Sequence, residues 1–259
     1  MNKNKLFHIA LTEEQGAKYA LLPGDPARVE KIAAFLDNPQ PLASNREFTS
    51  YSGTLCGERV LVLSTGIGGP SAAIAMEELC RIGVQTVIRI GTCGAMQPHI
   101  KGGHIVLATA AVRMEGTSKE YMPIEMPAAA DFSVVSALRA AAQECGFISH
   151  TGVVQSKDSF YGQHSPESMP VGTELKEKWD AWKKCGVLAS EMETAAIFSV
   201  AQVRKMKAGC VLYVLWNQEQ GDTQNNEQTV FDTSIAIQTA VNALKKLIVQ
   251  DRGENSDVG

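Results

Sequence analysis

The chain alternates short apolar runs with stretches at helical spacing, and this alternation limits the possible folds more than any other feature. "YALLPGDP" predicts a strand, a turn and a helix start, with Asp25 as the cap and Pro26 in the first helical turn. "RVLVLSTGIGGPSAAIAMEELCRIG" predicts a strand, a glycine-rich turn and a helix that Pro70 opens and Gly83 ends. A series of this kind is typical of a sheet covered by helices on both faces.

The same unit continues along the rest of the chain. Strands are predicted at "QTVIRIGTCGAM", "GHIVLATAAVR", "HTGVVQS" and "AGCVLYVLW", helices at "ARVEKIAAFL", "DFSVVSALRAAAQECG", "TELKEKWDAWKKCG" and 229–248, and a strand turning into a helix at "VLASEMETAAIFSVAQVRKM". No repeat, linker or low-complexity segment interrupts the series. Because 259 residues with 44% hydrophobic content can bury one large core, we expect a single α/β domain over residues 1–259 with three layers.

Composition and charge exclude several classes of function. The net charge is −4, the pI is near 5.8 and no basic run is present, so a nucleic-acid partner is not expected. The N-terminal segment has no apolar run of signal-peptide length, and the longest apolar run, "CVLYVLW", is too short to span a membrane. None of the six cysteines forms a CxxC pair, which is typical of reduced core thiols. We therefore expect a cytoplasmic protein without a membrane partner.

Two predicted strands end in segments that combine glycine with arginine, "LLPGDPARV" and "IRIGTCGA". Gly24 lets the backbone approach a ligand closely, and the helix start after it offers free N–H groups to an anion. Arg28 lies in that first turn, where the helix dipole disfavours a cation unless an anion is bound. Arg89 lies inside a buried strand and needs a partner. With Thr92, and with Arg46 in "SNREF", these residues predict an anion site; alternatively, Arg89 pairs with a structural carboxylate and Arg28 is solvated.

The segment "SEMET" places Glu191 and Glu193 two residues apart at the end of a predicted strand. In extended backbone such residues point the same way. One carboxylate can then accept hydrogen bonds from both hydroxyls of a cis-diol, with Met192 against the apolar face of a sugar. Alternatively, the two acids cap the helix that follows, because acids favour helix starts.

The stretch "KDSFYGQH", Lys157–His164, combines a cation, two aromatic rings, a glycine, an amide and an imidazole. It predicts neither a helix nor a buried strand, and its composition indicates a loop that holds a ligand. Alternatively, Lys157 is a solvated loop lysine and His164 a surface residue.

Taken together and in order, six motifs resemble the nucleoside phosphorylase-I family. They are "PGDPARVEKIA", "SNREFTSY", "STGIGGPSAAIAMEEL", "IRIGTCGAMQPHIKGG", "DSFYGQ" and "SEMETAA", within residues 5–220. Each motif is weak alone, but the set is specific. The stretch from "GVVQSKDSFYGQH" to "KEKWDAWKK" most resembles the uridine-cleaving subgroup known from Gram-positive bacteria.

The resemblance implies the phosphorolysis of uridine, with deoxyuridine as a further candidate, to uracil and the sugar 1-phosphate. Phosphate is then a co-substrate, and no cofactor is expected. The resemblance also implies a central mixed, partly barrel-like sheet flanked by helices. It implies a homo-oligomer, a hexamer built as a trimer of dimers.

The resemblance assigns roles to individual residues. It implies phosphate binding by Gly24, Arg28, Arg89, Thr92 and, from the neighbouring subunit, Arg46. It implies ribose binding by Glu191, Met192 and Glu193, with His8 reaching the 5′-hydroxyl across the dimer interface. It implies base binding by Phe160, which stacks, and Gln163, which bonds the base edge. Catalysis is expected from Arg89, Lys157, Gln163 and His164, and a monovalent cation such as K⁺ at Glu47, Ile67 and Ser71.

The sequence departs from the enterobacterial pattern of the family at two places in the base pocket. Ser165 and Gln218 stand where that pattern has arginines, and we expect Lys157 and His164 to replace the lost cations. Three alternatives stay open. A purine nucleoside phosphorylase or a nucleoside hydrolase needs an Asp at the end of the last strand, where this chain has Asn217, with Asp222 several residues later. The third is a non-enzymatic nucleoside-binding homologue.

Overall fold

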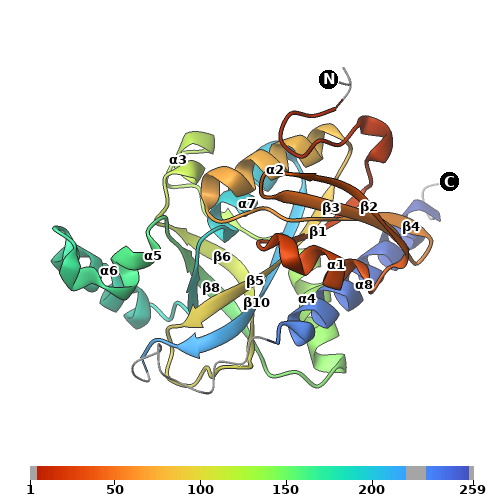
Figure 1. Ribbon diagram of the computed structural model, residues 1–259. Coiled ribbons are helices and arrows are strands. Elements are labelled where there is room, and N and C mark those ends of the chain that lie inside the picture. Colours follow the sequence, from red (N-terminus) through yellow and green to blue (C-terminus); the bar gives the residue numbers. More distant parts are fainter. Residues whose placement is uncertain (1–4, 220–231, 257–259) are drawn as a thin grey trace.

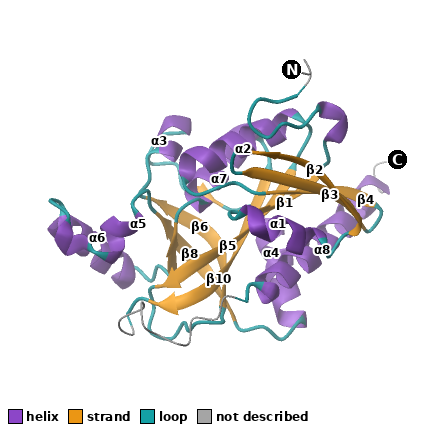
Figure 2. Ribbon diagram, in the orientation of Figure 1, coloured by secondary structure: helices purple, strands orange, loops and turns teal. Residues whose placement is uncertain are grey.

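The computed structural model describes residues 5–219 and 232–256 and shows a mixed α/β fold (Figures 1 and 2). The strands are β1 (Tyr19–Pro23), β2 (Asp37–Asn45), β3 (Phe48–Leu55), β4 (Glu58–Leu63), β5 (Thr86–Ala95), β6 (Ile105–Arg113), β7 (Ala128–Ala129), β8 (Ser149–Ser156), β9 (Ala189–Glu191) and β10 (Lys207–Asn217). The helices are α1 (Val29–Ala33), α2 (Gly69–Arg81), α3 (Thr117–Tyr121), α4 (Phe132–Glu144), α5 (Phe160–His164), α6 (Gly172–Lys184), α7 (Thr194–Arg204) and α8 (Ser234–Ser256). Within these ranges, no helix is long and apolar enough to cross a membrane.

The strands form one sheet, part of which closes on itself. β10 pairs with both β5 and β6, and β8 and β9 complete the circuit between them, so five strands make a barrel-like unit with mixed pairing. From β5 the sheet extends outward through β1, β4, β3 and β2. The expected mixed, partly barrel-like sheet is confirmed.

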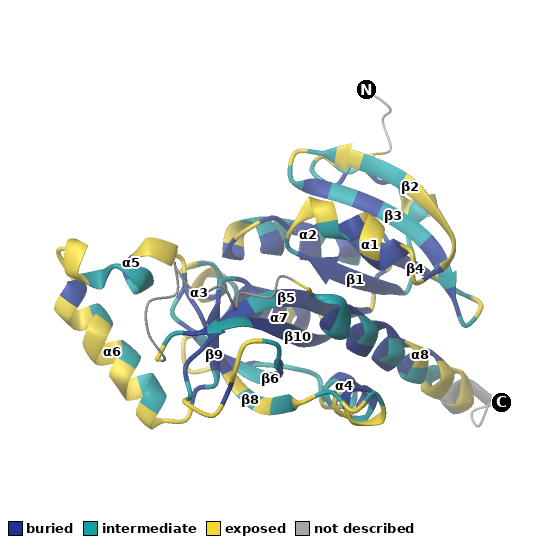
Figure 3. Cartoon of the chain, turned by 60° about the horizontal axis from the view of Figure 1, so that its bottom comes forward, coloured by how far each residue is buried: buried dark blue, intermediate teal, exposed yellow. Residues whose placement is uncertain are grey.

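Helices cover both faces of the sheet and produce the predicted three layers. In β4, Val60 and Val62 face the core shared with α1, α4 and α8, whereas Leu61 and Leu63 face the core shared with α2 and α7. Because both faces are buried, the strands read as continuous apolar runs. Helix α7 is buried at every position from 194 to 201, so it passes through the interior (Figure 3). Its N-terminus therefore brings polar residues into the middle of the protein.

Several local elements differ from the sequence expectations, among them α3 and β7, which were not predicted. The hairpin of β2 and β3 was not identified, because two prolines disrupt the pattern of β2; an edge strand tolerates them. The last helix begins at Ser234 and continues past the expected end at 248, since Asp251 bonds Tyr19 (2.8 Å) and Lys18 (2.7 Å) near β1. Within 157–164 the chain forms the one-turn helix α5, because Ser159 Oγ accepts a hydrogen bond from the Gly162 N–H at 2.9 Å.

Candidate active site

A cleft of about 670 Å³ opens at the carboxyl ends of β1, β5 and β9, beside α5. It brings together most of the residues that the sequence singled out: Gly24, Arg28, Glu47, Ile67, Arg89, Thr92, Lys157, Phe160, His164, Glu191, Met192 and Glu193. Four others do not line it, namely His8, Arg46, Ser71 and Gln163. Segments separated by more than a hundred residues in sequence thus meet in one hollow.

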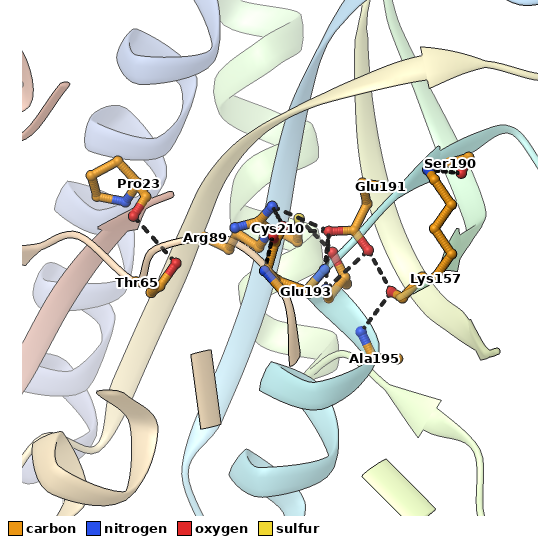
Figure 4. A network of polar contacts seen from close by, with 12 residues as sticks. Pro23, Thr65, Arg89, Lys157, Ser190, Glu191, Glu193, Ala195 and Cys210 are labelled. Atoms are coloured by element: carbon orange, nitrogen blue, oxygen red, sulfur yellow. Dashed lines mark hydrogen bonds and ion pairs between the residues drawn. The ribbon is translucent and has the colours of Figure 1, made fainter. Parts of the chain in front are cut away.

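Arg89 is held inside the protein by two carboxylates from the start of α7 (Figure 4). Its side chain projects from β5, and the residue is 3% exposed. Nη2 pairs with the Glu193 carboxylate and lies 3.2 Å from Glu191 Oε2, to which Nε also donates at 3.2 Å. Burial lowers the pKa of Arg89, but the two carboxylates raise it by more. The structural pairing considered as an alternative is therefore present, but Nη1 has no hydrogen-bond partner within the described ranges.

Glu191 and Glu193 converge on Arg89 as their spacing predicted, but they do different things. Glu191 also accepts hydrogen bonds from the Ser156 hydroxyl and from the N–H groups of Glu193 (2.9 Å) and Thr194 (3.0 Å), so it caps α7. Among the described residues, Glu193 accepts one further hydrogen bond, from the Gly68 N–H at 2.6 Å. Burial raises the pKa of Glu193, and the Arg89 charge opposes that rise. Glu191 is thus a structural carboxylate, and Glu193 is the one with acceptor capacity left for a ligand.

The other end of the cleft wall carries a second guanidinium, that of the half-buried Arg28. Arg28 follows the turn that Asp25 caps, with Asp25 Oδ1 accepting from Ala27 N at 2.9 Å. Its Nη1 is buried and has no partner in the described part of the chain. Burial lowers the pKa of Arg28, and the positive charge of Arg89 lowers it further. A Cβ at Gly24 would lie 3.3 Å from the Gly66 carbonyl oxygen and 4.0 Å from Arg89 Nη1, so only glycine leaves this space open. Two like charges with free donors favour a bound anion here.

A third cation of the cleft, which is buried, lies toward α5. Lys157 is 5% exposed, and its Nζ donates to Ser190 Oγ at 2.8 Å and lies 6.0 Å from the centre of the Phe160 ring. Burial lowers the pKa of Lys157 to about 8. The His164 ring packs on Phe160 with centroids 4.3 Å apart, and burial followed by the Lys157 charge lowers the pKa of His164. Trp216 lines the same end, and its buried Nε1 has no partner among the residues described.

Gln163 lies in a second chamber of about 690 Å³ that adjoins the cleft. Lys157, His164 and Gln218 line both spaces. Gln163 Nε2 donates to Gln218 Oε1 at 2.6 Å, and its Oε1 lies 2.7 Å from Ser190 Oγ. Sequence reasoning missed Ser190, although it directly precedes Glu191 in "ASEMET". A polar residue immediately before two functional acids was the available signal.

The two residues expected to serve a neighbouring subunit lie outside the cleft of their own chain. His8 Nδ1 is 2.7 Å from Glu78 Oε1, and Glu78 also accepts from the N–H groups of His8 and Ile9. Glu78 is buried and was not singled out in the sequence. Arg46 occupies the turn between β2 and β3 with φ 53°. The Arg46 side chain is therefore exposed, whereas the partly exposed His8 ring is held against Glu78.

Of the three residues suggested for a cation, Glu47 and Ser71 are in contact. Ser71 Oγ lies 2.8 Å from Glu47 Oε1 and 2.6 Å from the Thr65 carbonyl oxygen. Ile67, in the turn between β4 and α2, is 78% exposed. A hydrogen bond that the Glu47 carboxylate accepts from its own backbone N–H lowers the pKa of Glu47, and the hydrogen bond from Ser71 lowers it further. In the described part of the chain, no three His, Cys, Asp or Glu side chains are arranged to hold a metal ion.

Asn217 does not line the cleft. Its Nδ2 donates to the carbonyl oxygens of Gln97 (2.8 Å) and Ile100 (2.6 Å), and its Oδ1 accepts from Glu219 N at 2.8 Å. The side chain therefore fixes the loop after β5 and is fully occupied there. Asp222, the other candidate acid, lies outside the described residues.

Comparison with known proteins places this site in a family. Residues 18–249 match the family described as the phosphorylase superfamily. The chain is 52% identical to the uridine phosphorylase of Treponema pallidum, with 95% of each chain covered, and 44% identical to that of Salmonella typhimurium, with 96% of this chain and all of the relative covered. It is 36% identical to the guanosine phosphorylase of Halorubrum lacusprofundi over 93% of this chain and 98% of the relative. With the arginines of its cleft, its paired glutamates and a match over most of its length, the chain belongs to the phosphorylase superfamily.

Proposed function

We propose that the chain is a uridine phosphorylase, a pentosyltransferase that uses phosphate to cleave uridine, and deoxyuridine as a further candidate, to uracil and the sugar 1-phosphate. The observation that carries the proposal is the order of groups along one cleft. Two guanidinium groups with unpartnered donors lie at one end, Glu193 lies between, and an ammonium beside an aromatic ring lies at the other end. The relatives named uridine phosphorylase support the choice of substrate.

The reaction places opposite demands on the two ends. Breaking the N-glycosidic bond builds positive charge on the ribose and negative charge on the leaving base. Phosphate held by Gly24, Arg28, Arg89 and Thr92, with Arg46 from a neighbouring subunit, stabilises the sugar cation and attacks C1′. Glu193, with Met192 beside it, holds the ribose hydroxyls, while Glu191 keeps the start of α7 in place.

At the base end, donors stabilise the uracil anion as it forms. Phe160 offers its face to the ring, Gln163 bonds the edge, and Lys157 and His164 donate to the oxygens on which the charge accumulates. Preorganised donors of this kind contribute about 3 kcal/mol each. A lysine whose pKa lies near 8 is still mostly protonated at neutral pH, so it suits the task.

The test is the release of base from uridine, thymidine and inosine, with and without phosphate. We expect phosphate-dependent release of uracil from uridine. Release from inosine but not from uridine would overturn the proposal in favour of a purine phosphorylase. Release without phosphate would instead indicate a hydrolase, and no release from any nucleoside a binding protein.

We also propose that residues 1–259 act as one domain and that the functional unit is a homo-oligomer, a hexamer, in the cytoplasm. The positions of His8 and Arg46 outside their own cleft support the shared site. The free cysteines support a reducing compartment. A monovalent cation at Glu47, Ile67 and Ser71 is part of the same proposal. It is supported by the carboxylate, hydroxyl and carbonyl oxygens that meet there, and a rise in Tm with K⁺ but not with a large organic cation would test it.

A further inference from the structure

Ser190 is a buried hydroxyl at the centre of the base end, and none of the roles proposed above uses it. It lies in β9 and is 2% exposed. Its Oγ is 2.8 Å from Lys157 Nζ, 2.7 Å from Gln163 Oε1 and 2.5 Å from Gln155 Oε1. One hydroxyl thus touches three polar side chains from β8, its extension and α5.

The hydrogens around this hydroxyl can be counted. A serine hydroxyl has one proton and two lone pairs. The Lys157 ammonium can only donate, so it takes one lone pair. The single proton cannot serve the oxygens of both Gln155 and Gln163. Within the described residues, the Gln155 amide is held at its other end by a 3.2 Å contact from Nε2 to Met114 Sδ, which is a weak acceptor. Rotation of the Gln155 side-chain amide by half a turn, which exchanges its oxygen and nitrogen, therefore costs little. After this rotation the Ser190 hydroxyl proton is free to bond Gln163 Oε1.

The orientation of the Gln163 amide follows from this arrangement. Its Oε1 faces the Ser190 hydroxyl, and its Nε2 donates to Gln218 Oε1 at 2.6 Å. One lone pair of Oε1 and one hydrogen of Nε2 are left for a ligand. This pair matches an N–H group beside a carbonyl oxygen, as in uracil. With cytosine in the same place, the Gln163 oxygen would face the lone pair of a ring nitrogen, and the Gln163 N–H would face an amino group. Sites built on hydrogen bonds reject such mismatches strongly.

We propose that Ser190 is a positioning residue that holds the Lys157 ammonium and fixes the Gln163 amide in the orientation that selects uracil-like over cytosine-like bases. The inference rests on the proposed function and names the residue that sets its base specificity. The other charged or titratable groups near Lys157 are Glu191, Glu193, Cys93 and His164. The Gln163 amide bonds Gln218 and Ser190 and none of these four groups.

Three variants test the inference. Ser190→Ala removes the hydroxyl, and Ser190→Thr keeps it. Ser199→Ala is the matched control, because Ser199 is equally buried in α7 and its Oγ donates only to the Ala195 carbonyl oxygen at 2.7 Å, one turn earlier. For each variant, kcat/KM for uridine is measured from pH 6 to pH 10 with saturating phosphate, together with the inhibition constants of uracil and cytosine.

We expect Ser190→Ala to lower the preference for uracil over cytosine about tenfold. Loss of an acceptor disfavours the ammonium form of Lys157, so the basic limb of the uridine profile should move to lower pH by about one unit. Ser190→Thr should restore both properties, and Ser199→Ala should change neither. A purely structural role for Ser190 would lower Tm but would leave the base preference and the pH profile unchanged.

The failure of this inference is distinguishable from that of the proposed function. If the wild type cleaves uridine and a folded Ser190→Ala keeps both the base preference and the basic limb, the inference is overturned and the function stands. If the wild type releases no uracil, the function falls. The contact is then tested by NMR titration of the Lys157 side chain, assigned by its loss in Lys157→Met. Identical titration in the wild type and in Ser190→Ala overturns the inference in that case too.

Discussion

Arg89 and Glu193, 104 residues apart in the sequence, form a buried ion pair where β5 meets the start of α7 (Figure 4). Under the proposed function, the pair combines a donor for phosphate with an acceptor for the ribose hydroxyls. Because Nη2 is bound by Glu193, the guanidinium is held in place before a ligand arrives. Nη1 has no partner within the described ranges and is left to donate to that ligand. Preorganisation of this kind lowers the cost of binding.

Glu193 and Glu191 should separate function from stability. We expect Glu193→Gln to lower kcat/KM for uridine about a hundredfold and to lower the free energy of unfolding by less than Glu191→Gln does, because Glu191 still pairs with Arg89 and Glu193 accepts few other hydrogen bonds. Glu191→Gln should instead lose about 2–3 kcal/mol of that free energy, because Glu191 caps α7 and binds Arg89. Urea unfolding and steady-state kinetics measure the two effects. The reverse order would contradict our assignment of roles.

We expect Lys157 to cause a fall in kcat/KM for uridine at high pH, the basic limb of the pH profile. Burial lowers its pKa to about 8, so kcat/KM for uridine should fall above that pH. Lys157→Met should lose this limb together with most of the activity, whereas Lys178→Met, on an exposed part of α6, should keep both. An unchanged profile in Lys157→Met would return this residue to a structural role.

The same group should also affect stability in a defined pH window. Its folded pKa of about 8 lies below the ordinary value of 10.5, so between these values the unfolded chain binds more protons than the folded one. The free energy of unfolding of the wild type, relative to Lys157→Met, should therefore rise with pH across this window and be flat below it. Urea unfolding of both proteins from pH 7 to pH 10.5 measures the difference, and a fall across the window would contradict it.

Phosphate should relieve the repulsion between Arg28 and Arg89. At a hundred times its Kd, a ligand that binds only the folded state adds about 2.7 kcal/mol to the free energy of unfolding, so phosphate should raise Tm. Arg28→Ala should raise the KM for phosphate at least about tenfold and weaken the Tm shift, with little change in the KM for uridine. Arg139→Ala, at an exposed position of α4, is the control. Equal Tm shifts in both variants would remove Arg28 from the phosphate site.

Subunit mixing should show whether Arg46 serves a neighbouring cleft. Arg28→Ala and Arg46→Ala chains are each expected to be inactive alone. In a mixed dimer, one cleft keeps its own Arg28 and receives Arg46 from the other chain. Co-refolded equal mixtures should thus recover roughly a quarter of wild-type activity by random pairing. No recovery from chains that assemble normally would indicate that Arg46 acts within its own subunit.

Asn217→Asp should not create a purine phosphorylase. The Asn217 amide donates to two carbonyl oxygens of the loop after β5, and a carboxylate would face those oxygens without a proton to donate. We expect no phosphorolysis of inosine or guanosine, and a loss of about 1–3 kcal/mol in the free energy of unfolding. Asn217→Ser, which keeps a small donor, is the control. Purine cleavage by the Asp variant would contradict the structural role of this side chain.

The arrangement in layers was predictable because it depends on local periodicity. Runs such as "VLVL", residues 60–63, are apolar at every position only when both faces of a strand are buried, and the structure alternates these residues between two cores. The β2 and β3 hairpin and the end of α8 were not predictable in this way. They depend on edge position and on contacts such as that between Tyr19 and Asp251, which no local pattern encodes.

For the site, the sequence by itself determined which residues are present and, through short motifs, which of them belong together. It also placed Glu191 and Glu193 at the same strand end, but β9 ends at Glu191, so the turn before α7 and not an extended strand brings both carboxylates to Arg89. Only the tertiary structure decided which contact each of these side chains makes. It made Glu191 a helix cap, tied Asn217 to a loop, turned His8 toward Glu78 and placed Ser190 between Lys157 and Gln163. Each of these outcomes depends on which donors and acceptors from distant segments become neighbours once water is excluded, and only the folded chain specifies that.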